Sequence, residues 1–332
     1  MTHSSDVVGE VAVVTPPQAT AYGYHQLHQL RGRSVWRALV GALLVAAVGL
    51  GLMPVLWMLV FVIGGALAGM EQGALIDQLS LTGEATPLAL AFLMVSLASA
   101  IPVVWLFSRL LHGLRPGWTT SVFGRMRWKY FAVCIGLSVV ALVATLVVGA
   151  LMPATAQTPE MTGVNEFTST TRNFLLVVIF LVPFQAAGEE YLFRGYLTQA
   201  FGGLFSDPWI SRVAAVLVPA LLFALAHGPQ DPPIFVDRFA FGLVAGVLVI
   251  ATGGLEAAIA MHVLNNFVAF GLALAFTDMT SALNPTGGTW WSLPSTLTQS
   301  FVYLGLAVWA ARRMGLANQV WGAVLLAPKG AV

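Results

Sequence analysis

The sequence predicts an all-α, polytopic membrane protein with about eight transmembrane helices. Hydrophobic residues make up 58% of its 332 residues, and charged residues only 9%. Soluble globular domains carry about 25% charged residues, so a soluble domain is excluded. The apolar residues also gather in runs of about 20, the length that an α-helix needs to cross a bilayer. We therefore expect the lipid bilayer as surroundings, and a net charge of +1 gives no reason to expect a nucleic acid partner.

Eight apolar segments meet or approach this length. Pro54 predicts a kink in the first and longest of them, and Pro102 and Pro219 lie inside the second and the fifth. We expect no cleavable signal peptide, because the first run is too long for one. The eight segments cover residues 38–68, 87–111, 130–152, 173–190, 213–227, 234–251, 255–276 and 293–311.

Basic residues lie in alternate connections between these segments, as they do in the cytoplasmic loops of membrane proteins. We therefore expect both termini in the cytoplasm, and the connections 153–172 and 278–288 outside. A bacterial plasma membrane is the expected location. The basic residues that carry this prediction are Arg31, Arg33, Arg37, Arg109, Arg115, Arg125, Arg127, Lys129, Arg194, Arg212, Arg312 and Arg313.

Five polar side chains interrupt the apolar segments and are candidates for a site. Glu189 and Glu190 close the fourth segment, His227 closes the fifth, and His262 and Asn266 lie in the seventh. Ionisable groups at membrane depth are costly, so they usually face a protein interior and have a function. Because His262 and Asn266 are four residues apart, they share one helix face. We expect these side chains to line one polar cavity.

Two kinds of hydrolytic chemistry suit this set. A glutamate in a low-dielectric site can act as the general base for water, while imidazole and carboxamide groups stabilise the oxyanion. Alternatively, Glu189, His227 and His262 could bind Zn²⁺ with a water in the open position. The residue types do not separate these alternatives. The single cysteine, Cys134, excludes a disulfide or a cysteine-based metal site within the chain.

Three ordered patterns in these segments resemble the motifs of the CPBP family, which comprises the type II CAAX prenyl endopeptidases and bacterial bacteriocin-processing or self-immunity homologues. Each pattern alone is weak, but three in order on three apolar segments are a strong signal. The resemblance covers residues 174–276. The patterns are Glu189-Glu190-x-x-x-Arg194, Phe223-x-x-x-His227 and His262-x-x-x-Asn266.

The resemblance implies an α-helical intramembrane endopeptidase whose substrate is a peptide or a membrane-anchored protein. By motif position, Glu189 would activate the water, and His227, His262 and Asn266 would complete the site. Glu190 and Arg194 would form an ion pair that positions Glu189, with Phe223 beside the site. The family was long described as metalloproteases, so Zn²⁺ is the one possible cofactor that the resemblance suggests. We favour the mechanism without it.

This interpretation divides the chain into a flexible cytoplasmic tail (1–33), three N-terminal transmembrane helices (34–165), a CPBP-like core (166–280) and a last transmembrane helix with a C-terminal tail (281–332). One feature of the core is unexplained. Counted from Arg212, His227 lies about 22 Å along its helix, whereas Glu189 and His262 lie about 8–12 Å from their helix ends. We expect the fifth helix to start below the membrane surface, with Arg212 on a protruding turn, rather than to tilt or break at Pro219.

Two non-enzymatic functions are alternatives. The same carboxylates and imidazoles could form a proton relay in a transporter or an ion-coupled channel, although the sequence shows no internal repeat of the kind that many transporters have. An immunity or scaffold protein could also bind a partner through the same cavity.

Overall fold

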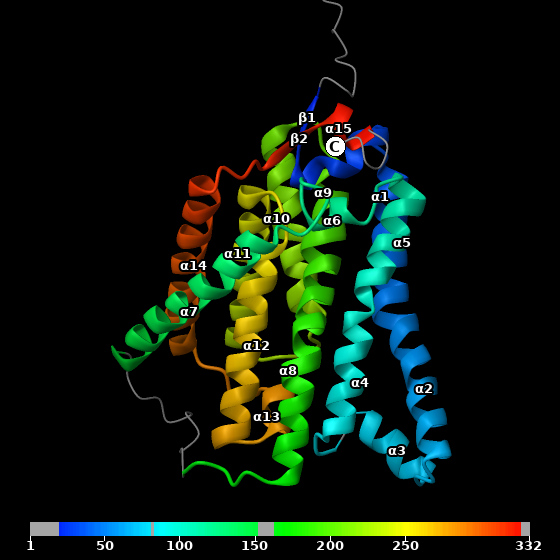
Figure 1. Cartoon of the computed structure of the whole chain (residues 1–332), viewed down its shortest axis with the longest axis vertical. Coiled ribbons are helices and arrows are strands. Elements are labelled where there is room, and N and C mark those ends of the chain that lie inside the picture. The colour runs from blue at the N-terminus through cyan, green and yellow to red at the C-terminus, as the bar shows by residue number, and fades with distance from the viewer. Residues whose placement is uncertain (1–19, 81–82, 152–162, 327–332) are drawn as a thin grey trace, which may run out of the picture.

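The computed structural model describes residues 20–80, 83–151 and 163–326, and within them the chain forms a bundle of helices (Figure 1). Seven helical segments of the described chain are long and apolar enough to cross a membrane. They confirm the all-α, polytopic membrane class. The seven segments are Val35–Leu67, Pro87–His112, Trp128–Val148, Ser169–Gly202, Pro208–Leu225, Pro232–Thr252 and Glu256–Phe276.

Some of these segments contain more than one helix, and short helices and one small sheet connect them. The α-helices are α1 (Val35–Ala46), α2 (Met53–Leu67), α3 (Gln72–Leu79), α4 (Pro87–Ala98), α5 (Ala100–His112), α6 (Gly117–Thr120), α7 (Trp128–Leu151), α8 (Ser169–Glu190), α9 (Thr198–Gly202), α10 (Pro208–Leu225), α11 (Pro232–Thr252), α12 (Glu256–Phe276), α13 (Met279–Leu283), α14 (Leu293–Arg313) and α15 (Gly322–Leu326). The other elements are β1 (Ala21–Gly23), β2 (Gln319–Trp321), the 3-10 helices η2 (Tyr24–Arg31) and η5 (Trp290–Ser292), and the π-helices η3 (Ala47–Leu52) and η4 (Tyr191–Leu197).

The predicted segments agree with these helices in position, although the eighth differs in character. It forms α14 but is not among the seven candidate spans of the described chain. Its first half is polar, with Thr296, Thr298, Gln299 and Ser300 in sequence. In the first segment, the π-helix η3 ends two residues before Pro54, the position where the sequence predicts a kink.

The fourth segment does not end at Glu190, as the sequence suggested. The helix continues through η4 and α9 to Gly202, so that the two glutamates lie in its interior. All seven residues of η4 are buried. A π-helical turn inserts a residue into the helical ladder and is frequent at functional sites. Here it directly follows the glutamate pair.

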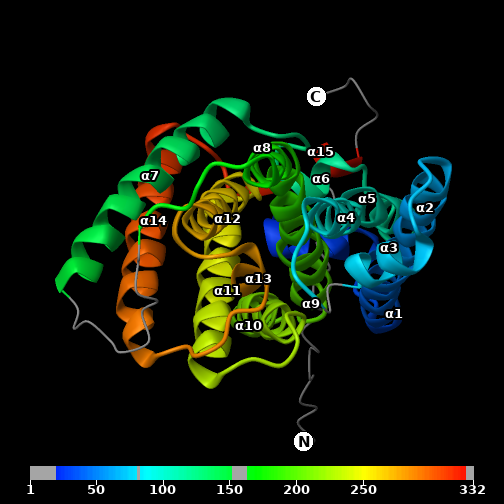
Figure 2. The same cartoon turned by 90° about the horizontal axis from the view of Figure 1, so that it is seen from below.

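The helix α8 lies at the centre of the bundle. It packs against α12 on one side and α4 on the other, and α10 pairs with α11 beside them (Figures 1 and 2). The helices α7 and α14 pack against each other at one edge, and α1 and α2 lie at the opposite edge. The segment η4 lies in the interior of the bundle, where a Cβ on Gly195 would lie 3.6 Å from Leu255, the residue before α12.

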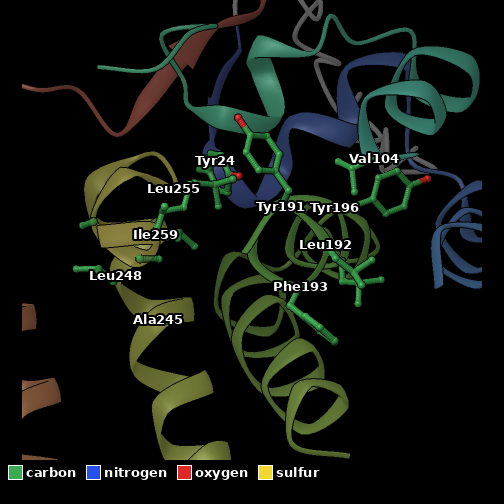
Figure 3. Packing of buried hydrophobic residues seen from close by; sticks show 14 of the residues in the cluster. Tyr24, Val104, Tyr191, Leu192, Phe193, Tyr196, Ala245, Leu248, Leu255 and Ile259 are labelled. Atoms are coloured by element: carbon green, nitrogen blue, oxygen red, sulfur yellow. The ribbon is translucent and has the colours of Figure 1, made fainter. Parts of the chain in front are cut away.

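The N-terminal part of the described chain closes one end of this bundle. The strand β1 pairs antiparallel with β2, and η2 inserts Tyr24, Leu27 and Leu30 into the core. Figure 3 shows Tyr24 beside Tyr191 of η4 and above Leu255 at the start of α12, whereas Tyr196 lies on the other side of η4 near Val104. The prediction of a flexible tail over residues 1–33 is therefore wrong for residues 21–31; residues 1–19 lie outside the described chain. We call this end of the molecule the β1–β2 end.

Candidate active site

The predicted site residues gather where α8, α10 and α12 meet. The chain directions of α8 and α12 are opposite, so residues of the two helices pair in two levels. At the upper level His262 contacts the glutamate pair. One turn further from the β1–β2 end, the Asn266 amide donates a hydrogen bond to Gln185 Oε1 at 2.9 Å. The spacing of four residues on each helix places both levels on the same pair of facing surfaces.

The imidazole of His262 lies between two carboxylates. Its Nδ1 is 2.8 Å from Glu190 Oε1, and its Nε2 is 3.4 Å from Glu189 Oε2. Because an ionised carboxylate only accepts hydrogen bonds, the short contact assigns the hydrogen of the neutral ring to Nδ1. Nε2 then faces Glu189. The side chain of His262 is 6% exposed, and that of Glu189 is 12% exposed.

The other carboxylate is held by a buried cation. Arg194 Nη1 donates to Glu190 Oε1 at 3.0 Å, so the predicted ion pair is present. Neither side chain is more than 1% exposed. The guanidinium also lies over the ring of Phe223, 4.1 Å from its centroid, which adds a cation–π contact. A buried ion pair is strongly destabilising to break, because the surviving partner becomes an uncompensated charge. Glu190 is therefore fixed in place.

His227 lies at the edge of this group. It follows the last turn of α10, and it is more exposed than His262. Its ring packs edge-on against Phe223, with 4.8 Å between centroids, and its Nδ1 lies 2.8 Å from the Phe223 carbonyl oxygen. Since a carbonyl only accepts, Nδ1 carries the hydrogen here too, and Nε2 of the neutral ring is an acceptor. Phe223 thus links His227 to Arg194 and His262.

The depth of His227 has a different explanation from the one the sequence suggested. The helix α10 is continuous from Pro208 to Leu225 through Pro219, and Arg212 lies inside it rather than on a separate turn. The sequence-based depth of Glu189 was too small, because its helix does not end at Glu190 but continues to Gly202. The helix α12 in turn starts beneath a loop, where Arg127 binds the buried carboxylate of Glu256 through Nε and Nη2. All three helices thus reach the same level inside the protein.

Three residues near the site were not predicted from the sequence. Gln185 precedes Glu189 by one turn, and a polar residue at that spacing in an apolar run was a usable signal. Phe241 packs its ring 5.3 Å from that of His262 and 5.9 Å from that of Phe223. Arg238, one turn earlier on α11, is close enough to interact with the charges of Glu189 and His227. No sequence motif marks these two, since only tertiary packing brings α11 to the site.

The donor set does not fit a metal site. Within the described residues, no group of three or more His, Cys, Asp or Glu side chains is arranged to hold a metal ion. The description as metalloprotease-like is therefore not supported.

Comparison with known proteins agrees with the motifs. Residues 171–268 match the family model described as type II CAAX prenyl endopeptidase Rce1-like, which confirms the resemblance to the CPBP family. An uncharacterized protein of Bacillus subtilis (strain 168), YyaK, is 27% identical over 233 residues, which cover 63% of this chain and 71% of that protein. No solved structure matches significantly. The matched region contains every predicted site residue and supports a CAAX-type intramembrane protease in general.

Proposed function

We propose that this chain is an intramembrane endopeptidase that hydrolyses peptide bonds of membrane-associated peptides or proteins, with Glu189 as the general base for water. The observation that carries the proposal is the arrangement of His262 between two carboxylates. Arg194 neutralises Glu190, whereas Glu189 has no cation in hydrogen-bond contact within the described residues. Glu189 is therefore the carboxylate that is available to take a proton.

In the reaction we propose, a water molecule lies beside Glu189 and His262 Nε2, both of which accept hydrogen bonds. Glu189 takes a proton as the water oxygen adds to the carbonyl carbon of the peptide bond. The carbon–nitrogen bond of the tetrahedral intermediate then breaks, and the proton passes from Glu189 to the leaving nitrogen. The products are a carboxylate and an amine. Glu190 and Arg194 act through His262, whose ring they orient.

The oxyanion of this intermediate needs hydrogen-bond donors. Asn266 has one amide hydrogen on Gln185, and its second hydrogen is available for the oxyanion. His227 donates from Nε2 only in its protonated form, because its Nδ1 hydrogen is committed to Phe223. A preorganised donor of this kind contributes about 10²–10³-fold to the rate.

The substrate would approach from the β1–β2 end, which we place in the cytoplasm of a bacterial cell. The basic connections support this placement, since α1, α7 and α10 begin at this end and α5 and α14 finish there. A peptide anchored in the membrane could present its cleavage site at the level of Glu189, between the faces of α8, α10 and α12.

The experiment compares small membrane-associated peptides in cells that express the wild-type protein or Glu189→Ala, with Glu71→Ala as control. Glu71 is an exposed carboxylate that caps α3 far from the site. We expect product peptides in the wild-type and control cells and uncleaved precursors in the Glu189→Ala cells. Identical peptides in all three would contradict the proposal. Proton-coupled flux, or a phenotype that the Glu189→Ala variant retains, would instead favour a transporter or a scaffold.

A further inference from the structure

A cavity lies away from the candidate active site, between α10, α11 and the β1–β2 end. Its volume is about 570 Å³, within the range of about 300–1,000 Å³ typical of ligand sites. None of the candidate catalytic residues lines it. The cavity therefore needs an explanation of its own.

The lining of this cavity comes from two helical stripes. Trp209, Val213 and Leu217 recur at helical spacing on α10, and Leu243 and Val247 do so on α11. The stripe on α10 extends over about 12 Å of helix and the one on α11 over about 6 Å, at 1.5 Å per residue. Four of these side chains are more than a third exposed. Both helices are also long and apolar enough to span a membrane, so exposed side chains on them can face lipid. The cavity is therefore open toward hydrocarbon and suited to an alkyl chain.

The two helices cannot close this space by moving together. A Cβ on Gly246 would lie 3.1 Å from Val216 Cγ1, and one on Gly242 would lie 3.0 Å from Ala220. The helices are thus already in close contact at these small residues. The cavity lies between this helix contact and the β1–β2 end.

The end of the cavity near the β1–β2 sheet is polar. Arg212 lines it, is exposed, and has neither a hydrogen bond nor an ion pair with another described residue. His25 also lines it and is only 4% exposed, and neither of its ring nitrogens has a hydrogen-bond partner in the described chain. Trp209 marks the interfacial level, since tryptophan is enriched where hydrocarbon meets headgroups.

Among the described residues that line the cavity, Arg212 is the single charged one. Burial, together with the charge of Arg212, lowers the pKa of His25 from 6.5 to about 4, so His25 is neutral at pH 7. An alkyl slot that ends at an unpaired cation is complementary to an anionic amphiphile. Basic residues at the membrane surface attract anionic lipids with about 1 kcal/mol each.

We propose that this cavity binds one anionic glycerophospholipid, with an acyl chain between α10 and α11 and its phosphate on Arg212. The bound lipid contacts Gly23 and His25 as well as both helices, so it ties the β1–β2 end to the bundle. A lipid that binds only the folded state also raises the unfolding temperature. This site is independent of the proposed peptidase activity.

The test is native mass spectrometry of the delipidated full chain in detergent, titrated with phosphatidylglycerol or phosphatidylcholine of the same acyl chains. We expect wild type to bind phosphatidylglycerol about fivefold more tightly, the factor that one cation supplies. Arg212→Gln should lose this preference and Arg212→Lys should keep it. Leu217→Trp, which fills the slot, should weaken the binding of both lipids. The unfolding temperature should follow the same order.

The matched control is Arg109→Gln, because Arg109 is also an exposed arginine at the β1–β2 end but does not line the cavity. This variant should bind both lipids like wild type. Equal binding of the two lipids to wild type, or an equal loss in Arg109→Gln and Arg212→Gln, would overturn the proposal. So would oleate binding that depends as strongly on Arg212, since a free fatty acid would then be the occupant.

Discussion

Glu189 and Glu190 are neighbours in the sequence, but their surroundings give them different chemistry. Glu190 is fully buried and shares its Oε1 between Arg194 and His262. Glu189 is partly exposed, and its Oε2 lies 3.4 Å from Nε2, the other nitrogen of the same imidazole. One carboxylate therefore orients the ring, and the other is available to take a proton. His227 and Asn266 complete the proposed site as hydrogen-bond donors.

His227 provides the residue-scale prediction. His227→Ala should lower kcat for peptide cleavage by about 100-fold or more, since it removes a donor to the oxyanion. His227→Gln should recover part of this loss, because its amide donates without needing to be protonated. The activity of His227→Gln should also persist to higher pH than that of wild type. Steady-state kinetics over pH 5–9 measures both effects, and equal activity of the Ala and Gln variants would contradict the donor role.

At the scale of elements, the position of α8 decides the site. Gly188 lies where α8 crosses the end of α4, and a Cβ there would lie 2.3 Å from the Leu97 carbonyl oxygen. The absence of a side chain thus allows the close approach that fixes the following glutamates. On the other side of the helix, η4 buries Tyr196, whose hydroxyl pairs with His112 Nε2 at 3.0 Å.

Gly188→Ala should therefore destabilise the protein by about 1–3 kcal/mol, as overpacking does. Gly136→Ala in α7 is the matched control, because a Cβ at Gly136 meets nothing within 4 Å. The control should be neutral or slightly stabilising, since alanine is the better helix former. Unfolding in detergent followed by circular dichroism compares the two, and equal stability of both variants would contradict the close contact.

The segment η2 makes the stability of the molecule depend on pH. His28 is 6% exposed and stacks on His112 with 3.6 Å between ring centroids. Burial and the neighbouring charges of His112 and Arg37 lower the pKa of His28 well below 6.5, and burial lowers that of His25 to about 4. Below pH 6.5 the unfolded chain therefore binds more protons than the folded one.

The unfolding free energy should be greatest above pH 6.5 and fall as the pH approaches 4, by on the order of 1–3 kcal/mol. His28→Phe keeps a stacked ring but cannot be protonated, so its stability should depend less on pH. Unfolding temperatures measured between pH 7.5 and 4.5 provide the test. The same slope in wild type and His28→Phe would show that His28 does not contribute.

At the scale of the whole molecule, both described ends of the chain meet in the β1–β2 sheet, and the basic connections lie at this end. The opposite end carries α3 and α13, where the Ala85 backbone N–H donates to Thr280 Oγ1. The two ends of the bundle therefore differ, because the basic connections lie at the β1–β2 end. This difference supports one orientation in the membrane.

Cysteine labelling in cells tests this orientation. Cys134 is fully buried and is the single cysteine, so Cys134→Ser provides the background. A membrane-impermeant maleimide should label Glu84→Cys in intact cells, and Arg312→Cys only after the cells are opened. Both positions are exposed. The reverse pattern would place the β1–β2 end outside.

The apolar runs were sufficient to predict the membrane class and the approximate position of each helix. They could not predict the continuation of α8, because Thr198 and Gln199 are polar and donate hydrogen bonds to the distant backbone carbonyls of Ala215 and Trp118. They also could not predict η2, whose His and Gln residues resemble those of a solvated tail. The motif residues were found because their spacing is local, whereas Phe241 and Arg238 reach the site only through the packing of α11.

The most direct test of the central claim is the rate of peptide cleavage by purified protein in bilayers, with wild type and Glu189→Gln compared. Glu189→Gln should fold and insert like wild type and should lose activity by about 10²–10⁴-fold, the contribution of a general base. Wild-type activity should survive exhaustive chelation. Cleavage by Glu189→Gln at the wild-type rate would contradict the account, and so would chelator-sensitive activity that stoichiometric zinc restores.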